Sequence, residues 1–263
     1  MQCVMMHIIF LLRIKDNFLV IFFYVILYLV IFMKLEVKNL TKSYGDNLVL
    51  DDIDFKFESN KIYGLLGRNG SGKTTFFNCI NQDIDIDNGT FYLISNKKEI
   101  LDTKDIGYVT AIPQVPEFLT GREFIQFYLD INKDKIDDLK DIDYYFDLVK
   151  LNNIDQDILI KEYSQGMKNK IQLLINIISN SKVILLDEPL TSLDIVVQED
   201  MKKLFKDLKK DHIIILSTHI LELAMDLCDE IVVLSNKKFN LIDKNDKNYR
   251  KNIIKSLKED ENV

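Results

Sequence analysis

Residues 67–74 read GRNGSGKT and join an apolar run, KIYGLLG at 61–67, to a helical pattern, KTTFFNCIN at 73–81. This stretch matches GxxxxGK[ST], in which glycines let backbone N–H groups close around a phosphate. The helix that follows directs its positive dipole end at the same anion. The sequence therefore predicts a nucleotide-binding loop between a strand and a helix.

Two side chains of this loop have specific expected roles. Lys73 is expected to reach the β- and γ-phosphates, and the Thr74 hydroxyl is expected to bind Mg²⁺. A glycine-rich turn without a ligand is the alternative, but the strand before the motif and the helix after it favour nucleotide. The residues predicted to bind nucleotide here are Gly67, Arg68, Asn69, Gly70, Ser71, Gly72, Lys73, Thr74 and Thr75.

Composition limits the classes of function. The 263 residues carry 34 Lys and Arg against 41 Asp and Glu, a net charge of −7. An acidic chain counts against nonspecific binding to nucleic acid or to an anionic membrane, and we expect no nucleic-acid partner. The 3 cysteines are far apart without a CxxC pair, which argues against a disulfide scaffold or a zinc ribbon and favours a reducing compartment.

A second motif ends another apolar run. Residues 183–188 read VILLDE, so two adjacent carboxylates follow four apolar residues. Asp187, at the end of a strand, is expected to bind Mg²⁺, and Glu188 is expected to polarise the water that attacks the γ-phosphate. The alternative is that both acidic residues lie in a solvated turn without a ligand. The nucleotide-binding loop (P-loop) predicted at 67–74 makes this alternative less favourable. No NKxD motif follows, which argues against a GTPase.

Strands and helices alternate along the chain. Apolar runs at 182–187, 212–217 and 231–234 are typical of buried parallel strands, and the alternation at 49–57 predicts an edge or half-buried strand. The pattern indicates an α/β fold with a parallel sheet. Residues 118–160 have helical periodicity; the face expected to be apolar comprises Phe124, Phe127, Tyr128 and Ile131.

The order of the motifs resembles the ATP-binding domain of ABC transporters. It comprises the P-loop, Gln114, YSQGM at 163–167, the acidic pair, SLD at 192–194 and His219. The resemblance implies a RecA-like P-loop NTPase core, an antiparallel β subdomain and a helical insert at about 115–162. It also implies a domain at 33–235, followed by a Lys-rich tail at 236–263, and an ATPase that uses ATP and Mg²⁺.

The resemblance also implies roles for residues outside the P-loop. Tyr44 corresponds to the aromatic residue that stacks on adenine, a contact that needs no base-specific hydrogen bond. Gln114 corresponds to a glutamine that contacts Mg²⁺ and couples to the membrane subunit. His219, in STHIL, corresponds to the histidine that contacts the γ-phosphate and helps to place the water. Asp194 is expected to run along an interface between two subunits.

The stretch YSQGMKNK at 163–170 is similar to the family signature LSGGQ but departs from it at three positions. Ser164 and Gly166 remain, and the family implies that they meet the γ-phosphate of a second subunit at the start of a helix near Met167. The departures resemble those of drug, antibiotic and peptide exporters of the ABC-2 type. A capped helix start without a ligand is the alternative for these two residues alone.

The expected assembly follows from the same family. One chain supplies one P-loop and one signature, so two ATP-binding subunits, identical or related, would form two composite sites. The expected function is ATP hydrolysis that powers export through separate multi-span membrane subunits, at the cytoplasmic face of the membrane. The alternatives are an ABC-type ATPase without a transport role and a membrane-anchored regulatory ATPase.

The N-terminal residues 1–32 form a hydrophobic extension. Residues 18–33 are apolar or aromatic without a charge, and as a helix they would span about 24 Å, short of the roughly 30 Å hydrocarbon core. Two interpretations stay open: a membrane anchor, or a start of translation at Met33 with the preceding residues mis-assigned. The second is favoured because the apolar length is marginal and MKLEVKNLTKSYG opens like a soluble domain.

Overall fold

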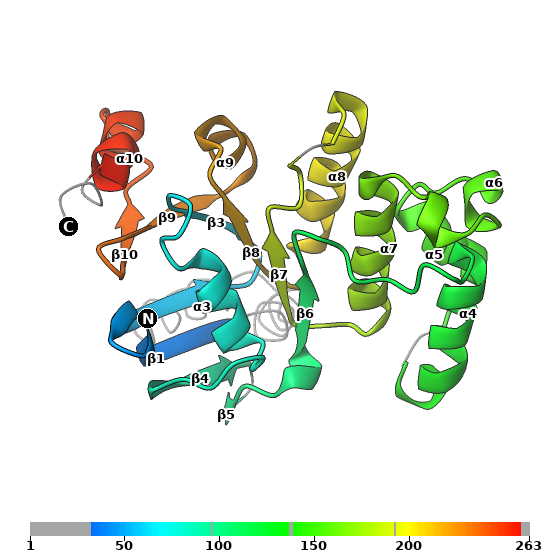
Figure 1. Cartoon of the computed structure of the whole chain (residues 1–263), viewed down its shortest axis with the longest axis horizontal. Coiled ribbons are helices and arrows are strands. Elements are labelled where there is room, and N and C mark those ends of the chain that lie inside the picture. Colours follow the sequence, from blue (N-terminus) through cyan, green and yellow to red (C-terminus); the bar gives the residue numbers. More distant parts are fainter. Residues whose placement is uncertain (1–32, 96, 137–138, 192, 259–263) are drawn as a thin grey trace, which may run out of the picture.

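The computed structural model describes residues 33–95, 97–136, 139–191 and 193–258. They contain an antiparallel sheet with the strand order β2-β1-β4-β5 and a second sheet with the order β10-β9-β3-β8-β7-β6 (Figure 1). The first sheet comprises β1 (Lys34–Tyr44), β2 (Asn47–Glu58), β4 (Asn88–Ile94) and β5 (Lys98–Ile100). The second comprises β3 (Ile62–Leu66), β6 (Ile106–Val109), β7 (Val183–Asp187), β8 (Ile213–Thr218), β9 (Glu230–Ser235) and β10 (Lys238–Ile242).

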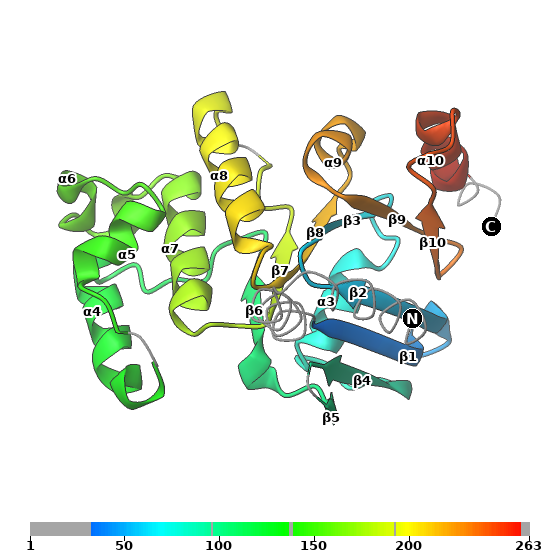
Figure 2. The ribbon, with the colours of Figure 1, turned by 180° about the vertical axis from the view of Figure 1, so that it is seen from behind.

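The second sheet is parallel from β9 to β6, and β10 runs antiparallel to β9 at its edge. The predicted α/β fold, with a parallel core and an antiparallel β subdomain, is confirmed. In Figures 1 and 2 the parallel sheet lies between two layers: α8 (Ile195–Leu208) and α9 (Leu221–Leu227) on one side, and α3 (Lys73–Ile80) with the antiparallel sheet on the other.

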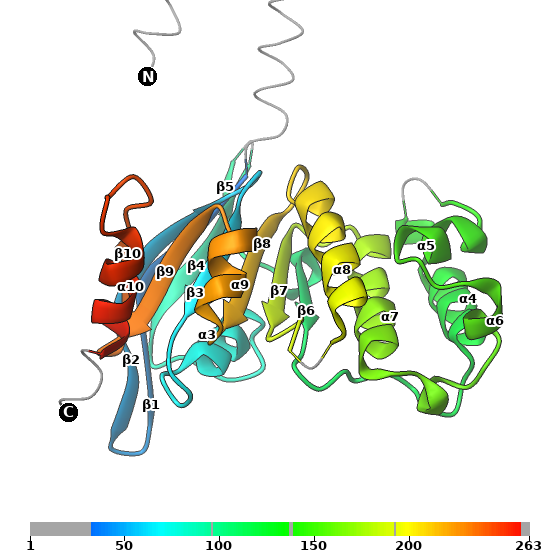
Figure 3. The ribbon, with the colours of Figure 1, turned by 90° about the horizontal axis from the view of Figure 1, so that it is seen from above.

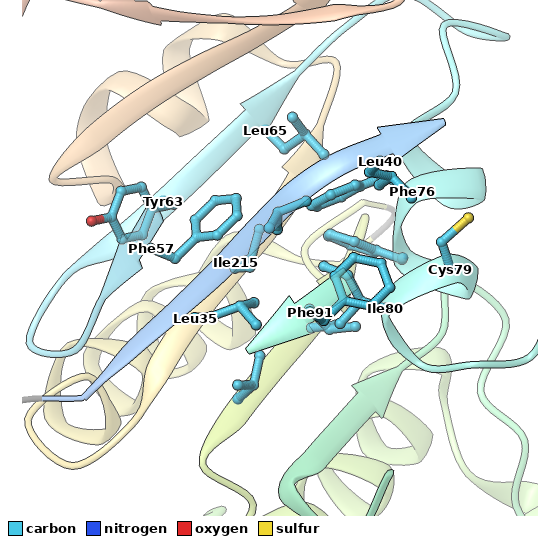
Figure 4. Packing of buried hydrophobic residues seen from close by; sticks show 14 of the residues in the cluster. Leu35, Leu40, Phe57, Tyr63, Leu65, Phe76, Cys79, Ile80, Phe91 and Ile215 are labelled. Atoms are coloured by element: carbon cyan, nitrogen blue, oxygen red, sulfur yellow. The ribbon is translucent and has the colours of Figure 1, made fainter. Parts of the chain in front are cut away.

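Alternate residues of the parallel strands face these two layers, as the strand period requires. Tyr63 of β3 packs in the core shared with the antiparallel sheet and α3. Its ring meets Phe57 of β2 nearly edge to face, with centroids 5.0 Å apart, and Phe76 of α3 lies in the same cluster (Figure 4). Ile62, next to it in β3, packs instead with residues of α8 and α9.

The helical insert lies at one end of the molecule, and β10 with α10 (Tyr249–Lys258) lies at the other (Figure 3). Its helix α4 (Gly121–Asn132) begins at a capping box: Thr120 Oγ1 accepts from Glu123 N at 3.1 Å, and Thr120 N donates to Glu123 Oε2 at 2.8 Å. The other helices of the insert are α5 (Ile142–Leu148) and α6 (Asn153–Gln156), and α7 (Gln165–Ile178) follows the insert.

The apolar face predicted for α4 is wrong at two of its four positions. Phe127 and Ile131 are 57% and 58% exposed, whereas Ile125 and Leu129 are buried. The buried pair is spaced four residues apart, so it forms one stripe that packs with α5 and α7. The other two members of the predicted face are partly buried beside this stripe.

The C-terminal segment contributes to the fold rather than trailing from it. β10 pairs with β9 in the register Phe239 with Leu234, so a boundary at 235 falls inside a hairpin. Helix α10 buries Ile253 against the core that contains α8 and α9, and its Arg250 forms an ion pair with Glu222 of α9 at 2.5 Å. The described lysines of this segment from Lys238 onward are exposed, as expected.

The predictions for residues 1–32 fall outside the described residues. Met33 begins the described chain, and its N–H donates to Ser59 Oγ at 3.0 Å. Within the described ranges, no helix combines the length and the apolar character that crossing a bilayer requires.

Candidate active site

The loop at 67–72 leads from β3 into α3, and the packing around it requires glycine. Gly72 has φ of +105°, and a Cβ there would lie 2.8 Å from a methyl carbon of Val49. A Cβ on Gly67 would lie 2.3 Å from Ser71 Oγ. These contacts leave the backbone, rather than side chains, at the inner surface of the loop. Such a surface suits the close approach of a phosphate.

Lys73 is the first residue of α3 and is 7% exposed. Its Nζ donates to the carbonyl oxygens of Gly67 at 2.8 Å and Arg68 at 3.1 Å, so the side chain lies along the loop. Burial lowers the pKa of the Lys73 ammonium, while the carboxylates of Glu188 and Asp187 oppose that shift. An anion bound beside this ammonium would also favour its charged form.

Asp187, at the end of β7, is held by hydroxyl groups from three other elements. Thr74 Oγ1 of α3 donates to Asp187 Oδ2 at 3.0 Å, and Ser217 Oγ of β8 donates to Asp187 Oδ1. The Tyr108 hydroxyl of β6 lies 3.5 Å from Oδ2. Burial and the nearby Asp187 carboxylate raise the pKa of Tyr108, so this hydroxyl stays protonated. Asp187 is therefore fixed in place with its carboxylate beside Thr74.

Glu188 follows with backbone φ of +49°, uncommon for a residue with a side chain. Its N–H points back to Ser217, 3.2 Å from both the carbonyl oxygen and Oγ of that residue. Its carboxylate contacts His219 Nδ1 at 2.8 Å through Oε1 and Thr191 Oγ1 at 2.9 Å through Oε2. Because of this backbone conformation, the carboxylates of Asp187 and Glu188 point in different directions.

These groups surround a cavity of about 320 Å³. Its described lining comprises Val49, Asn69, Gly70, Gly72, Lys73, Thr74, Thr75, Ala111, Asp187 and Glu188. Most of the predicted loop residues and both predicted carboxylates therefore meet at one place. Gly67 and Arg68 contribute carbonyl groups to Lys73, Ser71 Oγ is buried without a described partner, and His219 joins through Glu188.

Other predicted site residues lie outside that described lining. Tyr44 is 49% exposed, with Lys42 Nζ 5.1 Å from the centroid of its ring. Gln114 is exposed, and Ala111, three residues earlier, is the member of this segment that reaches the cavity. Asp194 caps α8 by accepting from Val196 N at 3.0 Å.

The signature also lies outside the described cavity lining of its own chain. Ser164 is the N-cap of α7, and its Oγ accepts from Met167 N at 3.3 Å. The helix therefore begins at Gln165, two residues before the predicted start. Gln165 Nε2 donates to the Ala111 carbonyl at 3.3 Å, which links the signature to the cavity wall. Gly166 fits closely under α8, since a Cβ there would lie 3.2 Å from Leu193 and Val197.

Sequence reasoning missed five residues around the carboxylates and the cavity. They are Val49, Tyr108, Ala111, Thr191 and Ser217. Two of them carried a local signal in the sequence. Thr191 lies three residues after the predicted base, and Ser217, at the end of β8, begins the STHIL motif. The others depend on how distant strands meet.

The family model for ABC transporters matches residues 50–191, which include the loop at 67–74 and the acidic pair at 187–188. The chain belongs to the ABC transporter family. It is an ATP-binding subunit of that family, and the reaction of this ABC domain is ATP hydrolysis.

Individual relatives support this family assignment, and a solved structure shares the fold. An ABC transporter ATP-binding protein of Methanocaldococcus jannaschii is 34% identical over 210 residues, covering 78% of this chain and 75% of the relative. The bacitracin transport ATP-binding protein of Enterococcus faecalis is 29% identical over 205 residues, covering 76% and 66%. A solved dimeric ATP-binding cassette, in a post-hydrolysis state with ADP and phosphate, has the same fold: its TM-score is 0.66 at 21% identity, covering 78% of this chain and 96% of that chain.

Proposed function

We propose that this ABC subunit binds Mg-ATP in the cavity at residues 67–75 and hydrolyses it to power export through separate membrane subunits. The observation that carries the proposal is the convergence of Lys73, Thr74, Asp187 and Glu188 on one cavity. Phosphoryl transfer depends on positioning and charge stabilisation, and these groups supply both.

The site fits Mg²⁺ through two oxygens. Thr74 Oγ1 and Asp187 Oδ2 lie 3.0 Å apart beside the loop, and both are hard oxygen ligands. Mg²⁺ commonly takes one or two protein oxygens and completes its shell with phosphate and water oxygens. When bound, it would neutralise part of the phosphate charge. Gln114 as a further ligand stays a prediction, because its side chain is exposed and Ala111 faces the cavity instead.

Some side chains of the site bind the nucleotide, and others take part in proton transfer. Lys73 binds the β- and γ-phosphates together with the backbone N–H groups of the loop. Glu188 accepts the proton of the attacking water, and His219, 2.8 Å from Glu188 Oε1, orients that carboxylate. Tyr44, whose ring is 49% exposed, stacks on the base.

The complete site requires a second ATP-binding subunit. Ser164 and Gly166 lie outside the described cavity lining of their own chain, and Ser164 is exposed at the start of α7. We infer that this helix start binds the γ-phosphate held by the P-loop of a second copy or a related subunit. Asp194, also exposed at a helix start, would lie along the same interface.

Ser164→Arg is expected to prevent ATP-dependent dimerisation while each chain still binds ATP. The longer cation would occupy the space that the γ-phosphate of the facing subunit requires, whereas the P-loop is unchanged. The measurement is light scattering on the Glu188→Gln chain, with and without Mg-ATP. Ser95→Arg, at an exposed residue just after β4, is the matched control. If the Ser164→Arg chain dimerises with ATP as fully as this control, the composite site is refuted.

Export through separate membrane subunits is supported by family membership and by the bacitracin transport relative at 29% identity. The tagged subunit, purified from native membranes in mild detergent, should bring down a polypeptide with several transmembrane helices. Such a complex would place this subunit at the cytoplasmic face of the membrane. Recovery of the subunit without any multi-span polypeptide, across several detergents and with the ATPase intact, would refute this arrangement.

A further inference from the structure

Thr191 contacts the proposed base through both its side chain and its backbone. Its Oγ1 donates to Glu188 Oε2 at 2.9 Å, and its N–H donates to the Glu188 carbonyl at 3.1 Å. The two bonds close the turn Glu188-Pro189-Leu190-Thr191, which brings the hydroxyl beside the carboxylate. The spacing alone does not require the side-chain bond, because a threonine at this position has other rotamers.

The turn that carries Thr191 is fixed by two helices. Asn169 Nδ2 of α7 donates to the Pro189 carbonyl at 3.2 Å, and Gln198 Nε2 of α8 donates to the Leu190 carbonyl at 3.2 Å. Leu190 itself is 1% exposed in the core beneath α8. The position of the Thr191 hydroxyl is therefore set by tertiary contacts on both sides of the turn.

The carboxylate of Glu188 needs such support. Its backbone has φ of +49°, and its side chain is 19% exposed at the cavity wall. His219 contacts only Oε1 and is itself 45% exposed. With that contact alone, the carboxylate could pivot about its terminal bond, since this torsion is broad. A second hydrogen bond to Oε2 removes the pivot.

We propose that Thr191 is a positioning residue that holds the Glu188 carboxylate in the orientation that accepts the proton of the attacking water. The inference rests on the proposed role of Glu188 as the base. Each carboxylate oxygen can accept two hydrogen bonds, so the water can be bound while Thr191 and His219 keep their contacts. Thr191 lies outside the described lining of the cavity, so its effect would pass through Glu188 and not through contact with nucleotide.

Thr191→Val is the central test, because valine keeps the shape and removes the hydroxyl. We expect kcat for Mg-ATP to fall about ten- to a hundredfold, the range that a misplaced catalytic group produces. The KM for ATP, the Kd for Mg-ADP measured by calorimetry, and Tm should stay close to those of the parent. Thr191→Ser, which retains the hydroxyl, should restore most of kcat. Thr90→Val on β4, outside the site, is the control for the substitution itself.

A second background separates this inference from the assignment of the base. In the Glu188→Gln chain, adding Thr191→Val should cause no further fall in turnover, because the group that Thr191 positions has already lost its function. An equal fall in both backgrounds would overturn the inference, as would Thr191→Val with the parent kcat or Thr191→Ser with no recovery. If Glu188→Gln itself turns over at the parent rate, the assignment of the base fails, whatever Thr191 does.

Discussion

Glu188→Gln is expected to lower ATP turnover by about 10²–10⁴-fold, the contribution of a positioned general base. Glutamine keeps the length of the side chain but cannot accept the proton of the attacking water. The loop, Lys73 and the Thr74–Asp187 pair at 3.0 Å are unchanged, so binding of Mg-ATP should survive. Phosphate release and equilibrium binding of ATP to the full chain measure the two quantities separately.

A matched control for this change is Glu99→Gln, an exposed residue of β5 in the antiparallel sheet. It alters the net charge equally and should leave turnover unchanged. Parent turnover in the Glu188→Gln chain would contradict the role of this residue. If the Glu188→Gln chain lost ATP binding together with turnover, this would contradict the assignment of proton transfer to Glu188 and of phosphate binding to other residues.

Lys73→Ala is expected to abolish most ATP binding and therefore hydrolysis. The ammonium is buried at the loop, and its removal takes away the charge placed to meet the β- and γ-phosphates. At a ligand concentration of 100 Kd, a bound nucleotide stabilises a protein by about 2.7 kcal/mol. The parent should show that stabilisation as a rise in Tm with Mg-ATP, and Lys73→Ala should show almost none.

Lys247→Ala, which removes an exposed lysine just before α10, is the control for charge and length. Its Tm should rise with Mg-ATP as that of the parent does. A Lys73→Ala chain whose Tm still rises by the full parental amount would place the nucleotide elsewhere in the molecule.

Much of the fold could be predicted because the parallel strands are buried on both faces. Continuous apolar runs at 182–187 and 212–217 correspond to β7 and β8 almost residue for residue. β10 carries no such run, since KFNLI is an edge strand whose residues are exposed or half-buried. Its pairing with β9 comes from tertiary contact and from the turn at 236–237, which periodicity does not report.

The buried face of α4 shows a different limit of prediction from sequence periodicity. Phe127 and Ile131 fit a helical stripe, yet the stripe that packs is the one through Ile125 and Leu129. Both sets obey the spacing of an amphipathic helix. Which one is buried depends on where α5 and α7 approach, and the residues of α4 alone do not carry that information.

The residues of the candidate site also fall into two groups, those that the sequence predicts and those that only the folded structure brings together. Lys73, Thr74, Asp187 and Glu188 could be predicted because each lies in a short motif at the end of a strand or the start of a helix. Ser217 lies beside a motif, but its contact with Asp187, thirty positions away in the sequence, is formed only by the pairing of β7 with β8. The path of the segment after β6 likewise decides that Ala111 reaches the cavity and Gln114 does not.

The most direct test of the central claim is phosphate release from Mg-ATP by the full chain, compared with its Lys73→Ala and Glu188→Gln variants at the same protein concentration. We predict steady turnover by the parent, no detectable turnover by Lys73→Ala, and at least a hundredfold lower turnover by Glu188→Gln, in line with the loss of a general base. Equal phosphate release by all three chains would contradict ATP hydrolysis in this cavity.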